Sequence, residues 1–243
     1  MNLSRPAYRS TVETAPPPGR TFWLLALVIA VVPLPLGANR PAAWSLLELA
    51  VGALLVMWSL SALRHPDRVA VPWRRHWPAT LAFALLILWL WLQSTALTPA
   101  SWHAPVWAEA ARVLHQPLAG AIGVTPEAAI VGIARLLAYG GVFWLALHYG
   151  RTERQARLLL WVLVGAATAY AVYGLIAMTA GNTTILWFAK WAYPHSLTAT
   201  FVNRNNFATY AGLAILAAVA LLKRRLRHGA GRRYFPFYRP WPL

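Results

Sequence analysis

Four polar side chains that could bind an anion stand together in the segment ATFVNRNNFATYAGL, residues 199–213. They are Asn203, Arg204, Asn205 and Asn206, and an apolar, helix-forming run follows them. A guanidinium is a planar fork of donors that fits phosphate or sugar oxygens, and amides add further donors. A polar motif that opens a membrane helix also leaves free backbone N–H groups, which suit an anion. The segment therefore predicts an anion-binding site at the rim of a membrane helix.

Helix capping is an equal alternative explanation for these asparagines. The side chain of Asn203 or Asn205 could accept a hydrogen bond from the first free N–H groups of the helix that follows. On residue chemistry alone, capping and anion binding both stay open.

Two ionisable side chains fall within apolar stretches that are long enough to cross a membrane. Glu48 lies six residues into the stretch 42–63, and Arg135 lies seven residues into the stretch 128–149, each counted from the end predicted to face outward. At 1.5 Å per residue, both would lie about 9–11 Å below the outer ends of their helices. Charged groups are rare and costly in lipid, so each marks a candidate functional site.

Two interpretations of these membrane charges are open. The first is a buried Glu48–Arg135 ion pair that holds the bundle together, because charges within a membrane mostly pair with one another. The second is that Arg135, with Arg204 above it, attracts a lipid-linked phosphate from the outer leaflet. Gln93 lies at a similar depth, and we expect it to face the same polar group and not the lipid.

The composition is that of a membrane protein. Of the 243 residues, 59% are hydrophobic and only 12% are charged, about half the charged share of a soluble domain. Six apolar runs come close to or reach the length of a membrane-spanning helix. These runs are residues 22–38, 42–63, 79–97, 128–149, 158–178 and 207–222. We predict an all-α, polytopic membrane helix bundle with about six transmembrane helices.

Particular residues set the helical length of two of these runs. Pro33 and Pro35 are expected to break the last turns of the run 22–38, because proline interrupts helical hydrogen bonding. The run 207–222 is short unless its helix begins within the segment 200–208, which we call the asparagine motif.

The basic residues predict the orientation of the bundle, because lysine and arginine concentrate in short cytoplasmic loops. With the N-terminus inside, the basic residues left outside would be Arg40, Arg112, Lys190 and Arg204. Arg135 lies within a span, and the others fall inside. We predict cytoplasmic termini, with a disordered leader at 1–20, a transmembrane domain at 21–222 and a basic cytoplasmic tail at 223–243. This asymmetry accounts for the net charge of +16 without a nucleic-acid partner.

A short helix is predicted in the long outer loop between residues 97 and 127. Thr98-Pro99 and Thr125-Pro126 both favour helix starts, with proline at the first helical position. Apolar residues between them recur at helical spacing, at Trp107, Ala110, Ala111, Leu114 and Leu118. We predict that this helix lies on the outer membrane surface, anchored by Trp102 and Trp107.

Other chemistries find little support in the sequence. The chain has no cysteine, no HxxxH or HExxH pair and no GxxxxGK[ST] loop, so it predicts no metal site and no nucleotide-phosphate loop. A proton-driven transporter usually carries several carboxylates in its spans, whereas here Glu48 stands alone. The adjacent glycines Gly140 and Gly141 favour close helix packing.

Two segments carry a resemblance to a known family. The segment from Thr200 to Ala208, TFVNRNNFA, followed by Tyr210-Ala211-Gly212, resembles the TFxNxNxFA-type signature of the O-antigen ligase and polymerase family. The segment from Pro33 to Pro41, PLPLGANRP, with Trp44 close behind, is also similar to members of that family. The resemblance runs from about the first span to the sixth.

The resemblance implies a location, a substrate and a mechanism. Members of this family are multi-pass proteins of the bacterial inner membrane, and they act on undecaprenyl-diphosphate-linked glycans at the periplasmic face. It implies an inverting glycosyltransferase that passes the glycan to an acceptor lipid or glycan in polysaccharide biosynthesis, with neither metal nor nucleotide-sugar cofactor. By the same resemblance, Asn203, Arg204, Asn205 and Asn206 would lie near the lipid diphosphate.

The chain also departs from the family pattern. Family members continue with more spans and a large periplasmic loop that carries the arginine and histidine linked to transfer. Here the residues after Leu222 read KRRLRHGAGRRYFPFYRPWPL. We therefore expect an N-terminal half of such a protein and carry over no catalytic residue. The alternative, from another class, is a non-catalytic membrane scaffold or transport subunit that binds a lipid or a partner through the same outer face.

Overall fold

The computed structural model describes residues 18–65 and 73–230, and nearly all of its regular structure is helical. The helices are α1 (Arg20–Val31), α2 (Pro41–Arg64), α3 (Trp73–Gln93), α4 (Pro105–Leu114), α5 (Pro126–Tyr149), α6 (Glu153–Thr179) and α7 (Arg204–Ala230). Among these described residues, five helices are long and apolar enough to cross a membrane, namely α2, α3, α5, α6 and α7. The prediction of an all-α, multi-pass membrane bundle is confirmed.

The first predicted span forms a shorter helix than expected. Helix α1 has 12 residues, which gives a length of about 18 Å against a hydrocarbon core of about 30 Å. The helix ends at Val31, ahead of Pro33, and a 3-10 turn follows at Leu36–Ala38. The prolines therefore remove much more of the run 22–38 from the helix than its last turns. Within the described residues, five of the six apolar runs form helices long enough to cross a membrane, and the first forms a shorter apolar helix.

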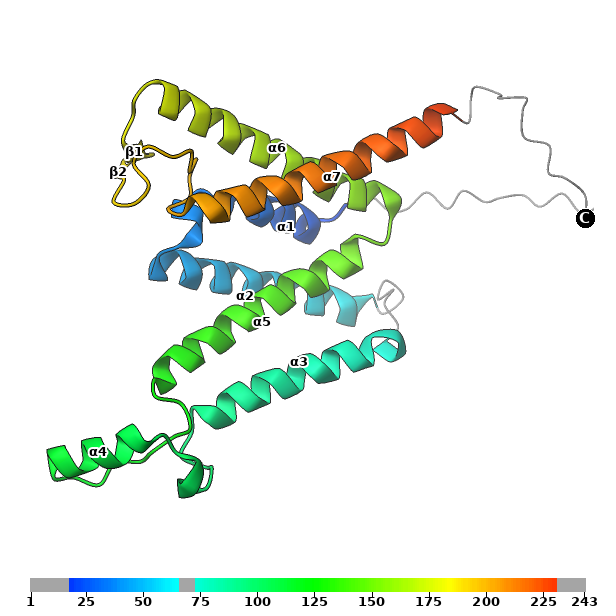
Figure 1. The fold of residues 1–243 in the computed structure, drawn as a ribbon. Coiled ribbons are helices and arrows are strands. Elements are labelled where there is room, and N and C mark those ends of the chain that lie inside the picture. Colours follow the sequence, from blue (N-terminus) through cyan, green and yellow to red (C-terminus); the bar gives the residue numbers. More distant parts are fainter. Residues whose placement is uncertain (1–17, 66–72, 231–243) are drawn as a thin grey trace, which may run out of the picture.

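The helices pack in the order α7, α6, α1, α2, α5, α3 (Figure 1). Helix α1 joins the α6–α7 pair to the group formed by α2, α5 and α3. Its Leu25 packs with Leu54 of α2 and Leu145 of α5 in a cluster that is almost fully buried. Large apolar side chains such as Phe143 remain exposed on the helix surfaces, as expected of a bundle surrounded by lipid.

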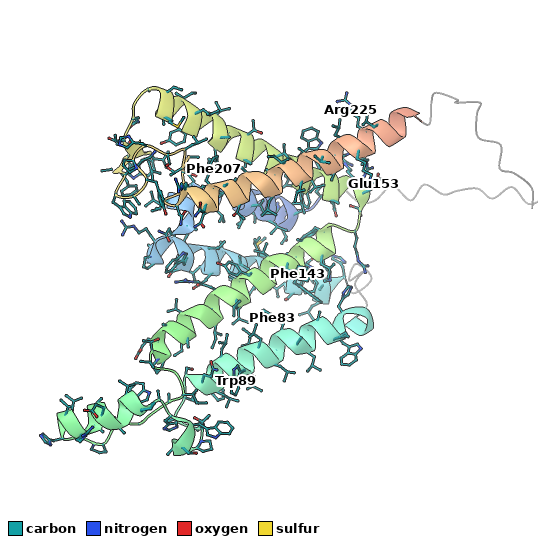
Figure 2. The ribbon with its side chains drawn as sticks, viewed as in Figure 1. Phe83, Trp89, Phe143, Glu153, Phe207 and Arg225 are labelled. Carbon is teal, nitrogen blue, oxygen red and sulfur yellow. The ribbon has the colours of Figure 1, made fainter. Side chains whose placement is uncertain are left out.

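Two adjacent glycines let α5 approach a helix on each side. A Cβ atom on Gly140 would lie 2.8 Å from Cζ of Phe83 on α3, and one on Gly141 would lie 2.7 Å from Cγ1 of Val51 on α2. Figure 2 shows Phe83 between α3 and α5. The packing role predicted for this glycine pair is confirmed.

Helices α2, α5 and α7 all begin at one end of the bundle, which we call the outer end after the predicted orientation (Figure 1). The opposite, inner end holds the short turn between α5 and α6. Helix α7 begins in the asparagine motif, the condition under which the sixth run is long enough to span, and it continues to Ala230. Residues 1–17 of the predicted leader and 231–243 of the predicted tail lie outside the described residues.

The predicted short helix in the outer loop is present as α4. It begins at Pro105 and ends at Leu114, whereas Thr98-Pro99 leads only into a 3-10 turn at Ala100–Trp102. The indole Nε1 of Trp107 donates a hydrogen bond of 3.1 Å to the Gly123 carbonyl oxygen. This hydrogen bond holds α4 against residue 123 of the same loop. Trp102, in contrast, is exposed. The position of α4 on the membrane surface stays a prediction.

Candidate functional site

The two sequence segments that resemble one family meet at the outer end. Gly37 lies in the turn between α1 and α2 with φ of +64°, and a Cβ atom there would lie 2.5 Å from Cδ1 of Phe201. Beside this contact, Leu36, Val202 and Ile185 form a buried apolar cluster. Residues far apart in the chain thus form one packed surface beneath the start of α7.

A two-stranded hairpin completes this surface. Strand β1 (Thr184–Ile185) pairs antiparallel with β2 (Phe188–Ala189). Between them, the backbone N–H of Leu186 donates a hydrogen bond of 2.6 Å to the hydroxyl of Tyr173 on α6. The loop between α6 and α7 is therefore held against α6.

Asn203 is the cap of helix α7. Its Oδ1 accepts a hydrogen bond of 2.8 Å from the backbone N–H of Asn205, and its carbonyl oxygen accepts one of 3.2 Å from the N–H of Phe207. Capping, one of the two alternatives for the asparagines, is thus confirmed for Asn203. Arg204, Asn205 and Asn206 are exposed in the first turn of α7.

Removing this cap should destabilise the start of α7 measurably. For Asn203→Ala we expect a loss of about 1 kcal/mol, because one free N–H group of the first turn loses its acceptor. The measurement is the thermal midpoint of the detergent-solubilised protein, together with hydrogen exchange at residues 205–207. Asn206→Ala is the matched control and should change neither value, and Asn203→Ser should keep the cap. Equal effects of the two alanine variants would contradict the assignment.

Two arginines from different helix ends lie against one short loop segment. The Cζ atom of Arg40, the residue preceding α2, lies 4.8 Å from the ring centroid of Trp191. The Cζ atom of Arg204 lies 5.2 Å from the ring centroid of Tyr193. Trp191 and Tyr193 are two residues apart, so their Cα atoms are separated by no more than about 7 Å. Both arginines are exposed and keep donors available for an anion.

Arg135 reaches the same end of α2 from α5. Its Cζ atom lies 3.2 Å from the ring centroid of Trp44, one helical turn from Arg40 along α2. Its Nε atom is buried without a hydrogen-bond partner. A buried guanidinium N–H without an acceptor is costly, so this position favours an anion. We call Arg40, Arg135 and Arg204 the outer arginine cluster.

The predicted ion pair between Glu48 and Arg135 is not formed. The ion pairs within the described residues join Glu109 to Arg112 on α4 and Glu153 to Arg224 at the inner end. The guanidinium of Arg135 faces Trp44 instead, while Glu48 lines an open groove along α2 with its neighbour Leu49.

Gln93 was expected to face the same polar group as Glu48 and Arg135, but no hydrogen bond or ion pair within the described residues joins these three side chains. Helix α5 lies between α2 and α3 (Figure 1), so it separates Gln93 on α3 from Glu48 on α2. The carbonyl oxygen of Gln93 accepts a hydrogen bond of 2.8 Å from the N–H of Gly123 in the outer loop.

Some features of the site were not singled out from the sequence. Arg40 could have been, because it stands inside the PLPLGANRP segment. Thr198 and Thr200 are 0% and 1% exposed, and their Oγ1 atoms have no hydrogen-bond partner. Thr200 belongs to the asparagine motif, but nothing in its residue type predicts burial.

The outer end therefore combines three arginines with the first turn of a membrane helix, and its chemistry suits a phosphate-bearing ligand at a membrane rim. Lys190 adds a further cation, although its Nζ donates to the Ser196 carbonyl oxygen at 3.3 Å. Comparison of the chain with protein-family models, with curated proteins and with solved structures found no match.

Proposed function

We propose that this chain is an O-antigen ligase-like membrane glycosyltransferase module. It binds an undecaprenyl-diphosphate-linked glycan at the periplasmic face of the bacterial inner membrane and serves its transfer to an acceptor lipid or glycan. The observation that carries the proposal is the convergence of Arg40 and Arg204 on Trp191 and Tyr193. These arginines come from the two segments whose sequences resemble that family, and such a convergence makes a diphosphate site.

The outer arginine cluster would act on the leaving group. An acceptor hydroxyl oxygen attacks the sugar carbon attached to the diphosphate, and the bond between that carbon and the diphosphate oxygen breaks. The bonding electrons remain on the diphosphate, so its negative charge grows in the transition state. Fixed guanidinium donors such as those of Arg40 and Arg204 stabilise that charge. The proton of the acceptor hydroxyl passes to a general base, and the proposal assigns that base to none of the described residues.

An apolar crevice beside the cluster suits the prenyl chain. It lies between α1 and α2, has a volume of about 220 Å³, and is lined by apolar residues that include Leu27, Val31, Pro35 and Leu46. Its upper wall is the turn that leads to Arg40. A lipid whose diphosphate meets the arginines could therefore lay the first part of its hydrocarbon chain in this crevice.

Reconstitution tests the proposed donor site and whether the chain transfers the glycan by itself. The full chain is placed in proteoliposomes with a glycan linked to undecaprenyl diphosphate and an acceptor glycolipid, and both donor retention and transfer are measured. Retention with transfer supports a glycosyltransferase and would overturn the expectation that the chain is a catalytically incomplete N-terminal half. Retention of the donor without transfer fits that incomplete module, and it also fits the scaffold or transport subunit. The proposed site is wrong if the chain retains neither lipid. It is also wrong if the chain retains undecaprenyl monophosphate to the same extent as the diphosphate-linked donor.

The proposal requires the outer end to face the periplasm. The chain has no cysteine, so a single introduced cysteine reports its own location. We expect Asn206→Cys to react with a membrane-impermeant maleimide in intact cells, and Arg151→Cys at the inner end to react only after lysis. Both residues are exposed. The reverse labelling pattern would show that the outer end faces the cytoplasm, where the outer arginine cluster could not reach a periplasmic donor.

A further inference from the structure

A basic groove lies between α6 and α7 at the inner end, opposite the proposed donor site. Its volume is about 330 Å³, and it is lined by Arg157 and Trp161 of α6 and by Leu221, Arg224 and Arg225 of α7. Figure 2 shows Arg225 and Glu153 near one another at this end, far from Phe207 at the start of α7.

The groove changes from charged to apolar along the helix axes. Helix α6 runs away from the inner end and α7 runs toward it. Trp161 is therefore one turn deeper than Arg157, and Leu221 is one turn deeper than Arg225, a step of about 6 Å in each helix. Leu221 is only 9% exposed and forms the floor, whereas Trp161 is 56% exposed and forms a wall.

The groove carries more positive than negative charge. Arg224 forms an ion pair with Glu153, which connects α7 to the first turn of α6. Arg157 and Arg225 are exposed on the two sides of the groove. Three guanidinium groups thus line the groove, one of them paired with a carboxylate, and the groove as a whole is positive.

We infer that this groove binds the headgroup phosphate of an anionic phospholipid from the leaflet at the inner end. Arg157 and Arg225 donate to the phosphate oxygens, and the first methylenes of an acyl chain lie over Leu221 beside Trp161. Basic pockets between transmembrane helices recognise anionic headgroups in this way, and arginine suits phosphate geometry. A free phosphate would leave the apolar floor of the groove without a contact. The change from charged to apolar lining therefore favours a lipid. The inference does not depend on the proposed glycosyl transfer.

Lipid retention by the full chain tests this assignment. Purified protein is reconstituted with phosphatidylglycerol or phosphatidylcholine, and bound lipid is counted by native mass spectrometry after mild delipidation. We expect phosphatidylglycerol to be retained, and the double variant Arg157→Gln/Arg225→Gln to lower its apparent affinity about 25-fold, at about fivefold for each arginine near the surface. The matched control is Arg64→Gln/Arg151→Gln, which removes the same charge from the same end, away from the groove, and should retain the lipid.

Each outcome decides for or against the groove. Equal losses in the two double variants would show diffuse charge attraction, and unchanged retention in the groove variant would place the lipid elsewhere; either result overturns the inference. Displacement of the lipid by millimolar inorganic phosphate or glycerol phosphate would also overturn it, in favour of a soluble phosphate site. The wild-type chain gives a test that needs no variant. A phosphatidylglycerol with a photoreactive group near its glycerol should crosslink to residues 157–161 and 221–225, and crosslinks confined to other helices would refute the site.

Discussion

Arg204→Gln should weaken binding of undecaprenyl diphosphate by about 10- to 100-fold, because a charge-assisted hydrogen bond contributes about 1.5–3 kcal/mol. Arg204 is exposed at the first turn of α7 and contacts Tyr193 through its guanidinium. Glutamine keeps a donor but loses the charge and the planar fork. The double variant Arg40→Gln/Arg204→Gln should lose binding below detection. The measurement is lipid retention by the full chain in nanodiscs that contain undecaprenyl diphosphate.

A matched control separates the site from general charge at the outer end. Arg112 lies on the same predicted side of the membrane but forms an ion pair with Glu109 on α4. Arg112→Gln should therefore leave binding unchanged. Folding is also protected, because the cap of α7 is Asn203 and not Arg204. If Arg112→Gln and Arg204→Gln weakened binding equally, the outer arginine cluster would have no special role.

Gly37→Val should destabilise the protein by about 3 kcal/mol or more. Two costs add at this position. The backbone has φ of +64°, which a β-branched residue adopts at a cost of about 1–3 kcal/mol, and a Cβ atom would lie 2.5 Å from the ring of the buried Phe201. Overpacking of this kind typically adds about 1–3 kcal/mol. The measurement is the thermal midpoint in detergent.

Gly181 isolates the first of these costs. It also has a positive φ, of +66°, but a Cβ atom there would meet nothing within 4 Å. Gly181→Val should therefore show the backbone strain alone. Gly37→Ala combined with Phe201→Leu should recover part of the stability that Gly37→Ala loses, which a double-mutant cycle measures. If Gly37→Val and Gly181→Val lowered the thermal midpoint equally, the contact with Phe201 would contribute nothing to the loss of stability at Gly37.

The long helices could be predicted because a continuous apolar stretch of sequence determines each one. A run of about twenty apolar residues can form little else in a membrane, and prolines mark the starts of α2, α4 and α5. The shortness of α1 was underestimated. Pro33 and Pro35 indicated that the first helix ends early, but not how much of the run 22–38 lies outside it.

The contacts within the site could not be predicted in the same way, because they join distant parts of the chain. The prediction that Glu48 pairs with Arg135 followed from charge alone. In the structure, the guanidinium of Arg135 lies over the ring of Trp44 instead. Tyr193 and Ala199 have φ of +52° and +48°, and no residue preference predicts a left-handed backbone at either. These two bends shape the loop that brings Trp191 and Tyr193 to the arginines.

The packing order of the helices has a mechanical consequence for the site. The principal contacts between the α6–α7 pair and the group of α2, α5 and α3 pass through the short helix α1. Arg204 belongs to the pair and Arg40 to the group, so a rocking of one against the other about α1 would part the two guanidiniums. A diphosphate bound by both arginines would link the two helix groups across α1. Binding of the diphosphate would also raise the unfolding temperature by mass action. An unfolding temperature that rises with donor concentration would report binding of the donor, and loss of this rise in both Arg40→Gln and Arg204→Gln would indicate that the donor contacts both helix groups.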